Sequence, residues 1–499
     1  MRRTALGNVR RTNTAGSSCA READGFVMSS RFQEHSALSR RGILKGALGT
    51  AALAAAAPSF AHTPGRKPNF LFILADDLGY ADLSVYGRRD YETPVLDRLA
   101  AQGTRFTHAY ANSPVCSPTR VGLITGRYQY RLPVGLVEPL SNNAGVGLPV
   151  THPTMPSLLR DLGYRTTLIG KWHLGELPTY GPLKSGYDEF YGIRHGGVDY
   201  FTHKIYNEED LWDGDTKIEE TGYLTDLLAE KTLETLTRRS QEDQPWLISL
   251  HLTAPHWPWV GPNDRAESER LDATGNPMAI THYDGGSLAT YAEMVTYMDA
   301  QIGRILAKLS ELGMDQDTVV VFTSDNGGER FSDTWPFTGV KTELLEGGIR
   351  VPAIVRWPGL SMPGMVSEAP IMSMDWLPTF LAAAGGAPHP KFPSDGVDIR
   401  SAIGGRELVE RPLFWKYKNH GQQAVRSGKW KYLQIGGNTF LFDILADPLE
   451  RGNLKEREPV IFAQLEQTWQ RWNSEMLTYP AESPSSGFTA QTLADHFGQ

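Results

Sequence analysis

Short apolar runs alternate with amphipathic stretches from residue 68 onward. This pattern predicts an α/β fold with a large, mostly parallel sheet flanked by helices. Four of the apolar runs are predicted strands that lead into polar clusters: NFLFILADD (69–77), RTTLIGKWH (165–173), PWLISLHLTAPH (245–256) and TVVVFTSDNGG (318–328). Ligands of open α/β sheets bind at the carboxyl ends of the strands. We therefore expect the four polar clusters to form one site.

The last hundred residues have a different pattern. The stretch AVRSGKWKYLQIGGNTFLFDI (424–444) predicts short antiparallel strands, with Gly436–Gly437 as a turn. Residues 458–476 have apolar positions at helical spacing, which predicts a helix packed on that small sheet. We expect a large domain over 62–405 and a smaller C-terminal domain over 406–499. Low-complexity sequence is limited to the N-terminal segment and to PAESPSSG (480–487).

The N-terminal segment reads as an export signal. SRRGILK (39–45) precedes an Ala/Gly-rich run that ends in SFA (59–61), which is typical of a bacterial twin-arginine signal. Residues 1–61 are therefore predicted to engage the twin-arginine export machinery and to direct the chain to the periplasm or outside the cell, with Met28 as an alternative start. A membrane anchor is the other interpretation. The apolar run 46–57 is, however, well short of the ~20 residues a spanning helix needs, so no stable membrane anchor is expected.

Charge and cysteine content exclude several functions. The chain carries a net charge of −8, and residues 1–61 hold nine Lys and Arg against three Asp and Glu, so the remainder is near −14. An acidic chain is a poor general binder of nucleic acid, and none is expected as a partner. An anionic substrate would require locally concentrated positive charge. Of the two cysteines, Cys19 lies in the predicted signal, so the remaining Cys116 excludes an intramolecular disulfide and a Cys-based metal cluster.

Cys116 lies within SPVCSPTRVGLITGR (113–127). Ser117 is predicted to cap a helix in which Pro118 is the first residue. The thiol would then lie beside a helix N-terminus, with Arg120 returning to the same face. Backbone N–H groups there favour an anion, so we expect a thiolate, or an oxyanion in its place, to be stabilised. A lone cysteine is otherwise most often a small buried hydrophobe.

The motif C-x-P-x-R followed by TGR is the signature of the sulfatase family, which CSPTRVGLITGR resembles at every defining position. Further segments resemble sulfatases in the family's order, among them ADDLGY (75–80), GYRTTLIGKWHLG (163–175), SDNGG (324–328) and EGGIRVPAIVRWPG (346–359). The resemblance implies an alkaline-phosphatase-like fold and hydrolysis of a sulfate monoester to inorganic sulfate. It also implies that a maturase converts Cys116 to formylglycine, whose hydrated aldehyde is the nucleophile.

The two acidic pairs predict a metal site. Asp76, Asp77, Asp325 and Asn326 offer only oxygen ligands, the set preferred by a hard divalent cation. Either pair alone would fit turn or helix-cap chemistry. The resemblance implies Ca²⁺, with an oxygen of modified residue 116 as a further ligand, and the sequence leaves Mg²⁺ open.

A set of basic residues falls on the family's motif positions, although single residues of this kind are usually surface groups or core histidines. The set comprises Arg120, Lys171, His173, His256 and Lys341. The resemblance implies that Lys171, His256 and Lys341 hold the sulfate, and that His256 or Lys341 protonates the departing alcohol. His173 and Asp325 would help to deprotonate the two hydroxyls of the hydrated aldehyde.

Three loops rich in aromatic residues are expected around the site: 197–215, 256–259 and 329–337. The first contains DYFTH, which resembles the arylsulfatase B and N-acetylgalactosamine-sulfatase branch and favours a sulfated carbohydrate, with His203 as a candidate contact. Two other functions stay open. One is a phosphodiesterase or phosphonate monoester hydrolase on the same scaffold, and the other is a binding protein with unmodified Cys116.

Overall fold

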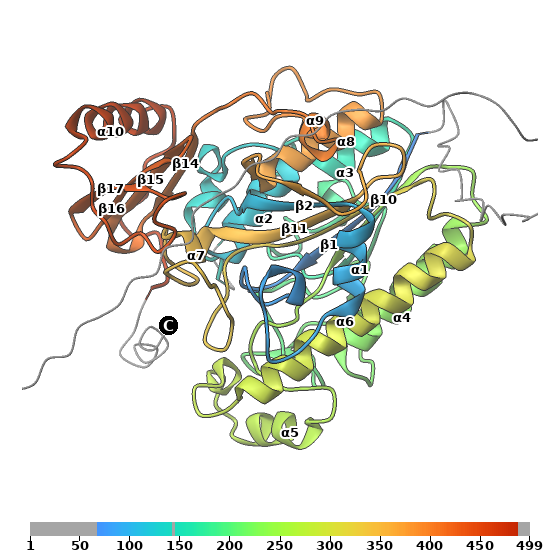
Figure 1. Cartoon of the computed structure of the whole chain (residues 1–499). Coiled ribbons are helices and arrows are strands. Elements are labelled where there is room, and N and C mark those ends of the chain that lie inside the picture. The colour runs from blue at the N-terminus through green and yellow to red at the C-terminus, as the bar shows by residue number, and fades with distance from the viewer. Residues whose placement is uncertain (1–66, 142–144, 488–499) are drawn as a thin grey trace, which may run out of the picture. The chain divides into compact units, whose positions relative to one another are not determined.

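The computed structural model describes residues 67–141 and 145–487, so the predicted export segment and Cys19 lie outside the described residues. Within them, eleven strands form a mixed sheet in the order β12-β2-β11-β10-β1-β9-β3-β4-β7-β8, with β13 paired to β2 (Figure 1). The strands are β1 (Asn69–Ala75), β2 (Thr104–Tyr110), β3 (Arg165–Gly170), β4 (Glu189–Gly192), β7 (Trp212–Asp213), β8 (Thr216–Lys217), β9 (Trp246–His251), β10 (Thr318–Ser324), β11 (Arg350–Arg356), β12 (Met365–Ser367) and β13 (Ile371–Met372). The predicted large, mostly parallel sheet is confirmed.

The four strands predicted from apolar runs lie together at the centre of the sheet. β10, β1, β9 and β3 are parallel neighbours. Their register places Ala75 opposite Ser324, and His251 opposite both Leu74 and Gly170. The carboxyl ends of the four strands therefore meet at one edge of the sheet, which is where the polar residues that follow them must lie.

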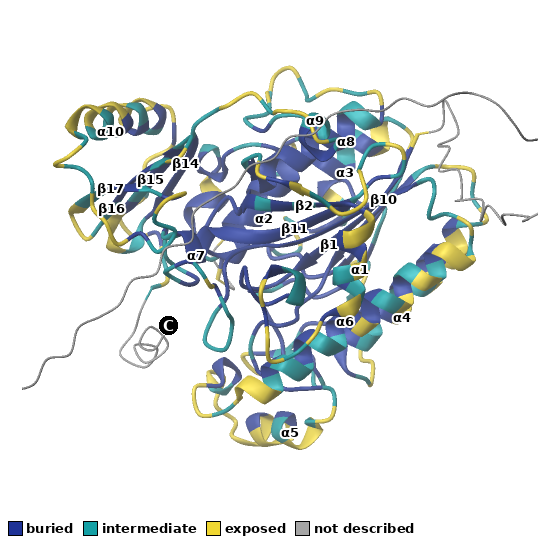
Figure 2. Ribbon diagram, viewed as in Figure 1, coloured by how far each residue is buried: buried dark blue, intermediate teal, exposed yellow. Residues whose placement is uncertain are grey.

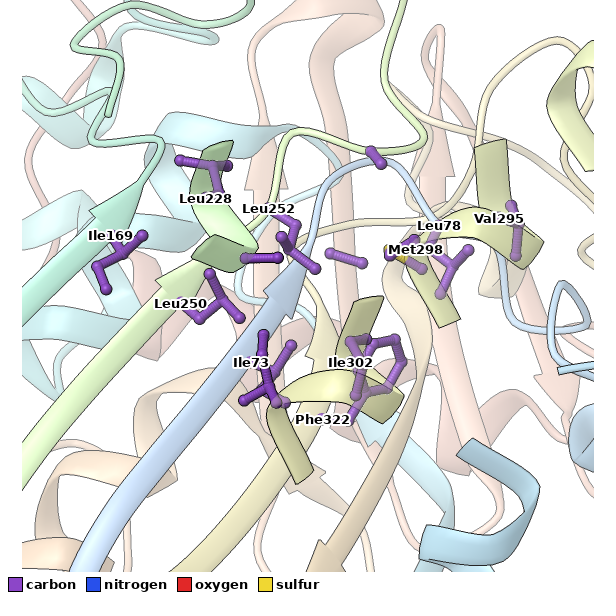
Figure 3. Close-up of a cluster of buried hydrophobic side chains, with 14 of the residues drawn as sticks. Ile73, Leu78, Ile169, Leu228, Leu250, Leu252, Val295, Met298, Ile302 and Phe322 are labelled. Carbon is purple, nitrogen blue, oxygen red and sulfur yellow. The ribbon is translucent and has the colours of Figure 1, made fainter. Parts of the chain in front are cut away.

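Helices cover both faces of the sheet because the strand side chains alternate between two apolar layers. Leu71 and Ile73 of β1 face α1, α4 and α6, whereas Phe70 and Phe72 face α2, α3, α8 and α9. Figure 3 shows the first layer, with Ile73 beside the α6 residue Ile302. The helices are α1 (Pro94–Gln102), α2 (Cys116–Thr125), α3 (Met155–Asp161), α4 (Leu224–Arg239), α6 (Leu288–Glu311), α8 (Trp376–Ala383) and α9 (Arg400–Ile403).

Helix α6 illustrates how the sequence determines these layers. Its N-cap Ser287 accepts a hydrogen bond from the Thr290 N–H at 3.0 Å. Its buried positions recur at intervals of three or four residues, as in Met294, Met298 and Ile302, so one face of the helix turns to the sheet. Figure 2 shows the central strands of the sheet as buried, while helices such as α4 and α6 expose their outer faces.

The C-terminal residues form a second, antiparallel sheet in the order β14-β15-β16-β17, covered by a helix. Its elements are β14 (Leu413–Tyr417), β15 (Gln422–Ser427), β16 (Trp430–Ile435), β17 (Asn438–Asp443) and α10 (Pro459–Asn473). Gly436 and Gly437 make the predicted turn with φ angles of 57° and 79°. The indole of Trp469 on α10 donates to the carbonyl of Trp415 at 2.9 Å. The predicted small sheet and its helix are thus confirmed, and sequence analysis missed β14.

The small sheet contacts the large one through a third apolar cluster and a buried ionic group. Lys431 of β16 lies 2.9 Å from Glu346 and 2.8 Å from Glu450, with all three side chains fully buried. Glu346 also accepts from the Tyr110 hydroxyl at 2.7 Å. It begins α7 (Glu346–Ile349), which leads into β11. The boundary predicted near residue 405 lies between α9 and β14 and stays a prediction.

The remaining elements are the hairpin of β5 (Lys204–Ile205) and β6 (Glu208–Glu209), and helix α5 (Arg265–Ala273). Across residues 67–141 and 145–487, no helix combines the length and the apolar character that crossing a bilayer requires.

Candidate active site

Cys116 is the first residue of α2, and its thiol is almost fully buried. The predicted cap is wrong by two residues, because the N-cap is Val115 and not Ser117. The Ser117 hydroxyl instead accepts a hydrogen bond from the Leu140 N–H at 2.6 Å. The side chain of Ser117 thus ties a distant loop to the helix start, a contact that local sequence does not reveal.

The four predicted oxygen ligands meet at the ends of β1 and β10. Asp77 has a left-handed backbone with a φ of 61°, and its N–H donates to Asp325 Oδ1 at 3.2 Å. The amide of Asn326 donates to Asp77 Oδ1 at 2.7 Å. The Cys116 sulfur lies 3.8 Å from the same oxygen. The structure therefore brings the two acidic pairs and residue 116 together, as the sequence predicts.

Three buried cations surround these carboxylates. Arg120 donates to Asp325 Oδ2 through Nε at 3.0 Å and through Nη2 at 2.8 Å. Lys171 Nζ lies 2.6 Å from Asp76 Oδ2, and Lys341 Nζ lies 2.6 Å from Asp77 Oδ2. Positive charge is thus concentrated at one point of an acidic chain, which is what an anionic substrate requires.

The two predicted histidines flank the cluster in opposite tautomers. His173 Nε2 lies 2.8 Å from the Leu140 carbonyl, and His256 Nδ1 lies 2.8 Å from the Trp257 carbonyl. A carbonyl only accepts, so each of these nitrogens carries the proton. The unprotonated nitrogens are Nδ1 of His173, which is buried without a partner, and Nε2 of His256, which lies 3.5 Å from Asp77 Oδ2.

Burial and the dense charges shift the pKa values of this cluster. Burial, together with the charge of Asp325, raises the pKa of Asp76 well above its usual range. Burial acts in the same direction on Asp77, but Lys341 and Lys171 lower the pKa of that carboxyl below its usual range. Burial also raises the pKa of the Cys116 thiol well above its usual value. The pKa therefore does not favour the predicted thiolate, because burial and the charges of Asp76 and Asp325 outweigh those of Lys171 and Lys341.

The residues present fit a hard divalent cation. Asp76, Asp77, Cys116 and His256 each place one ligand atom within 4.8 Å of the others. Asp76 Oδ1 and Asn326 Oδ1 are buried oxygens without a hydrogen-bond donor, which a cation would satisfy. Carboxylate and amide oxygens at this position suit Ca²⁺ or Mg²⁺.

Several neighbours of the cluster were not found from the sequence. Glu329 lies 3.3 Å from Lys341 Nζ, and the Tyr200 hydroxyl donates to the His256 carbonyl at 2.9 Å. Gly196 and Gly197 pass so close that an added Cβ would lie 2.7 Å from the His173 ring and 2.9 Å from the His256 ring. A glycine pair within HGG is the only sequence signal of this close approach.

His203 lies directly before β5, away from the polar contacts of the cluster. Its side chain is buried, and burial lowers its pKa. The carboxylates whose charges oppose this lowering of the pKa are Asp199 and Glu220, and neither belongs to the cluster. The structure therefore does not join His203 to the other predicted site residues.

Comparisons with known proteins show which sequences and structures this chain is similar to. The family model described as Sulfatase matches residues 68–387. N-acetylgalactosamine-6-sulfatase of Canis lupus familiaris is 32% identical over 404 residues, covering 76% of this chain and 74% of that protein. The crystal structure of Ps i-CgsB aligns with a TM-score of 0.75 and 28% identity, over 83% of this chain and 94% of that one, and a second structure is its complex with k-i-k-neocarrahexaose. Phosphonate monoester hydrolase of Agrobacterium radiobacter shares the fold, with a TM-score of 0.57 and 20% identity over 85% of this chain and all of that one.

Proposed function

Because the chain belongs to the sulfatase family and is a sulfatase, we propose that it releases inorganic sulfate from the sulfate monoester of a carbohydrate. The reaction would use formylglycine formed from Cys116 by a maturase, and a bound Ca²⁺ ion, with Mg²⁺ as the alternative. The observation that carries this proposal is the convergence of residue 116 with four oxygen ligands and three buried cations.

The metal ion and the hydrated formylglycine would each contribute chemistry that the other side chains of the site lack. Asp76, Asp77, Asp325, Asn326 and residue 116 would hold the metal, which supplies a Lewis acid when bound. Formylglycine supplies, as its hydrate, a nucleophilic hydroxyl and a second hydroxyl that plain Cys lacks. The Sγ atom of Cys116 stands where one of those oxygens would be.

The chain's own residues bind the anion and move protons. Arg120, Lys171 and Lys341 bring three positive charges to the carboxyl end of the sheet, where they would stabilise the sulfate oxygens as charge develops. Asp325 would accept a proton from the attacking hydroxyl. The Nδ1 atom of His173 carries no proton and has no hydrogen-bond partner among the described residues. It could therefore accept the proton of the second hydroxyl.

Protonation of the departing alcohol is assigned to His256 or Lys341. The Nε2 atom of His256 faces Asp77 at 3.5 Å and carries no proton in this tautomer, so His256 would have to take up a proton there before it could donate one. Lys341 carries a proton throughout the ordinary pH range, because Asp77 and Glu329 raise its pKa against the opposing effect of burial. Either group would remove the negative charge from the leaving oxygen.

A carbohydrate substrate is supported by the similar proteins and by the rim of the site. The relative from Canis lupus familiaris is named for a sulfated amino sugar, and Ps i-CgsB was crystallised with an oligosaccharide. The loops 197–215, 256–259 and 329–337 carry aromatic residues such as Trp257 and Trp335, and the latter is 61% exposed. Exposed indole faces suit stacking on sugar rings.

Steady-state rates on matched aryl sulfate and aryl phosphate esters test this function. A sulfatase should turn over the sulfate ester faster by kcat/KM. Faster turnover of the phosphate or a phosphonate ester would assign the chain to the hydrolases of those esters that share this fold. An intact Cys116 thiol in protein from the producing cells, together with no turnover of either ester, would support the binding-protein interpretation.

We further propose that residues 1–61 are a twin-arginine signal, that the enzyme works in the periplasm or outside the cell, and that residues 406–499 form a separate C-terminal domain. His203, which lies directly before β5, is a further candidate substrate contact. N-terminal sequencing of the exported protein tests the signal, since cleavage should follow residue 61.

A further inference from the structure

Leu140 links the catalytic His173 to a distant part of the chain. Its N–H donates to the Ser117 hydroxyl at 2.6 Å, and its carbonyl accepts from His173 Nε2 at 2.8 Å. Ser117 adjoins residue 116, so Leu140 spans the nucleophile position and the histidine. The carbonyl of Leu140 is what fixes the proton of His173 on Nε2 and leaves Nδ1 free.

Two residues earlier, the backbone of Glu138 is held by residues Tyr479–Ser486, which we call the C-terminal strap. The Glu138 N–H donates to the Pro484 carbonyl at 3.1 Å, and the Ser486 N–H donates to the Glu138 carbonyl at 2.6 Å. Glu138 and Ser485 thereby form a parallel bridge. The strap includes residues 480–486 of PAESPSSG, so this low-complexity sequence has a defined place in the fold.

The carboxylate of Glu138 is fully buried and binds the same strap. It accepts from the Ser485 hydroxyl and from the Lys418 N–H, both at 2.9 Å, and from the Tyr479 hydroxyl. The ammonium group of Lys418 also donates to the Pro480 carbonyl at 2.9 Å. The strap is therefore clamped between Glu138 and the chain that follows β14.

We propose that the C-terminal strap positions His173 for catalysis, acting through Glu138 and Leu140. The inference rests on the proposed function, which makes His173 a base. If the strap is released, the N–H of Glu138 loses its partner and the buried carboxylate keeps only the Lys418 N–H, so the segment must move to satisfy these groups. Leu140 then leaves His173 Nε2, and both tautomers of the ring become populated. Such a shift misplaces the base without removing it.

Two full-length variants separate this role from general support of the fold. Ser486→Pro removes the N–H that binds the Glu138 carbonyl, whereas Ser486→Ala keeps that N–H and is the matched control. Tyr479→Phe removes only the hydroxyl that donates to Glu138, so it provides a milder test if Ser486→Pro does not fold.

The first measurement is the ¹⁵N spectrum of histidine-labelled protein, in which the His173 signal is identified by its loss in His173→Gln. Wild type and Ser486→Ala should show a single Nε2–H tautomer, and Ser486→Pro and Tyr479→Phe a mixture. The second is kinetics: kcat on a sulfate ester should fall roughly 10- to 100-fold in Ser486→Pro, with KM within about twofold of the control.

A folded Ser486→Pro protein with the control's tautomer and kcat would overturn the inference, as would an unchanged tautomer in Tyr479→Phe when only that variant folds. The spectrum does not require conversion of Cys116. If the wild type hydrolyses no sulfate ester, the proposed function fails while the tautomer comparison still decides whether the strap positions His173.

Discussion

His173 and His256 leave opposite ring nitrogens without a proton, Nδ1 in His173 and Nε2 in His256. The carbonyls of Leu140 and Trp257 impose this difference by each accepting the proton of the other nitrogen. Burial, together with the charge of nearby lysines, lowers the pKa of both rings well below the usual value. Two neutral imidazoles therefore border the site at neutral pH, and each can take up a proton during turnover.

Substitutions that keep each anchor but remove the free nitrogen should slow the reaction without unfolding the protein. The amide of Gln in His173→Gln can still donate to Leu140, and the shorter amide of Asn in His256→Asn can still donate to Trp257. We expect kcat to fall by about 10²- to 10⁴-fold in each case, the usual contribution of a general acid or base. Steady-state kinetics with thermal unfolding as the control measures this, and an unchanged kcat would exclude the residue from proton transfer.

The dependence on the leaving group should tell the two histidines apart. If His256 protonates the departing alcohol, the loss in His256→Asn grows as that alcohol becomes a weaker acid, because the unassisted oxygen leaves with more charge. The loss in His173→Gln should be independent of the alcohol. A series of aryl sulfates of graded phenol pKa measures both slopes. Equal slopes for the two variants would leave Lys341 as the proton donor.

Calcium should stabilise the folded protein through the oxygens of Asp76 and Asn326 that lack donors. At a Ca²⁺ concentration of about 100 times Kd, ligand binding adds about 2.7 kcal/mol to the free energy of unfolding. Thermal unfolding with and without Ca²⁺ measures the effect, which Asn326→Ala should reduce. A melting temperature that changes with neither Ca²⁺ nor Mg²⁺ would argue against the metal site.

Lys431 should be far more important for stability than Lys429, two residues away. Lys431 is fully buried between Glu346 and Glu450, and Lys431→Met leaves Glu450 without its cation and Glu346 with Arg350 alone, which costs about 3–5 kcal/mol of unfolding free energy. Lys429 is half exposed in its pair with Asp443, so Lys429→Met should cost less than about 1 kcal/mol. Urea unfolding compares them, and similar values would show that the buried group does not join the two sheets.

The same ionic group predicts a pH effect. Burial raises the pKa of Glu450 from 4.5 to about 7, and nearby Glu346 acts in the same direction, whereas Lys431 opposes it. A raised pKa stabilises the fold below pH 4.5, and this contribution is lost as the pH rises to about 7. Glu450→Gln should therefore gain stability relative to wild type between pH 5 and pH 8. A difference in unfolding free energy that stays constant over this range would contradict the prediction.

The site was predictable where sequence-local features determine it. Asp76 and Asp325 directly follow strongly apolar strands, and parallel neighbours place such residues at one edge of the sheet. Cys116 lies two residues before a proline that favours a helix start. The structure places Cys116 at that helix start, one turn from Arg120. These relationships depend on strand period, helix start and motif spacing, all of which can be read from one sequence.

The rest depends on contacts between distant residues, which a single sequence does not encode in a readable way. Ser117 was expected to cap its own helix, but its hydroxyl binds the backbone of Leu140. The strap binds Glu138 across more than 340 residues, partly through backbone groups that leave no mark on the sequence. The pKa of Cys116 depends on burial, which local charge patterns do not reveal.

The chemical state of residue 116 tests the central claim most directly. Trypsin cleavage after Arg105 and Arg120 isolates residues 106–120, and the mass of that peptide can be measured on protein purified from the cells that produce it. We predict a mass that corresponds to replacement of the Cys116 thiol by an aldehyde, in proportion to the sulfatase activity of the sample. A sample that hydrolyses sulfate esters while every such peptide carries an intact thiol would contradict the account.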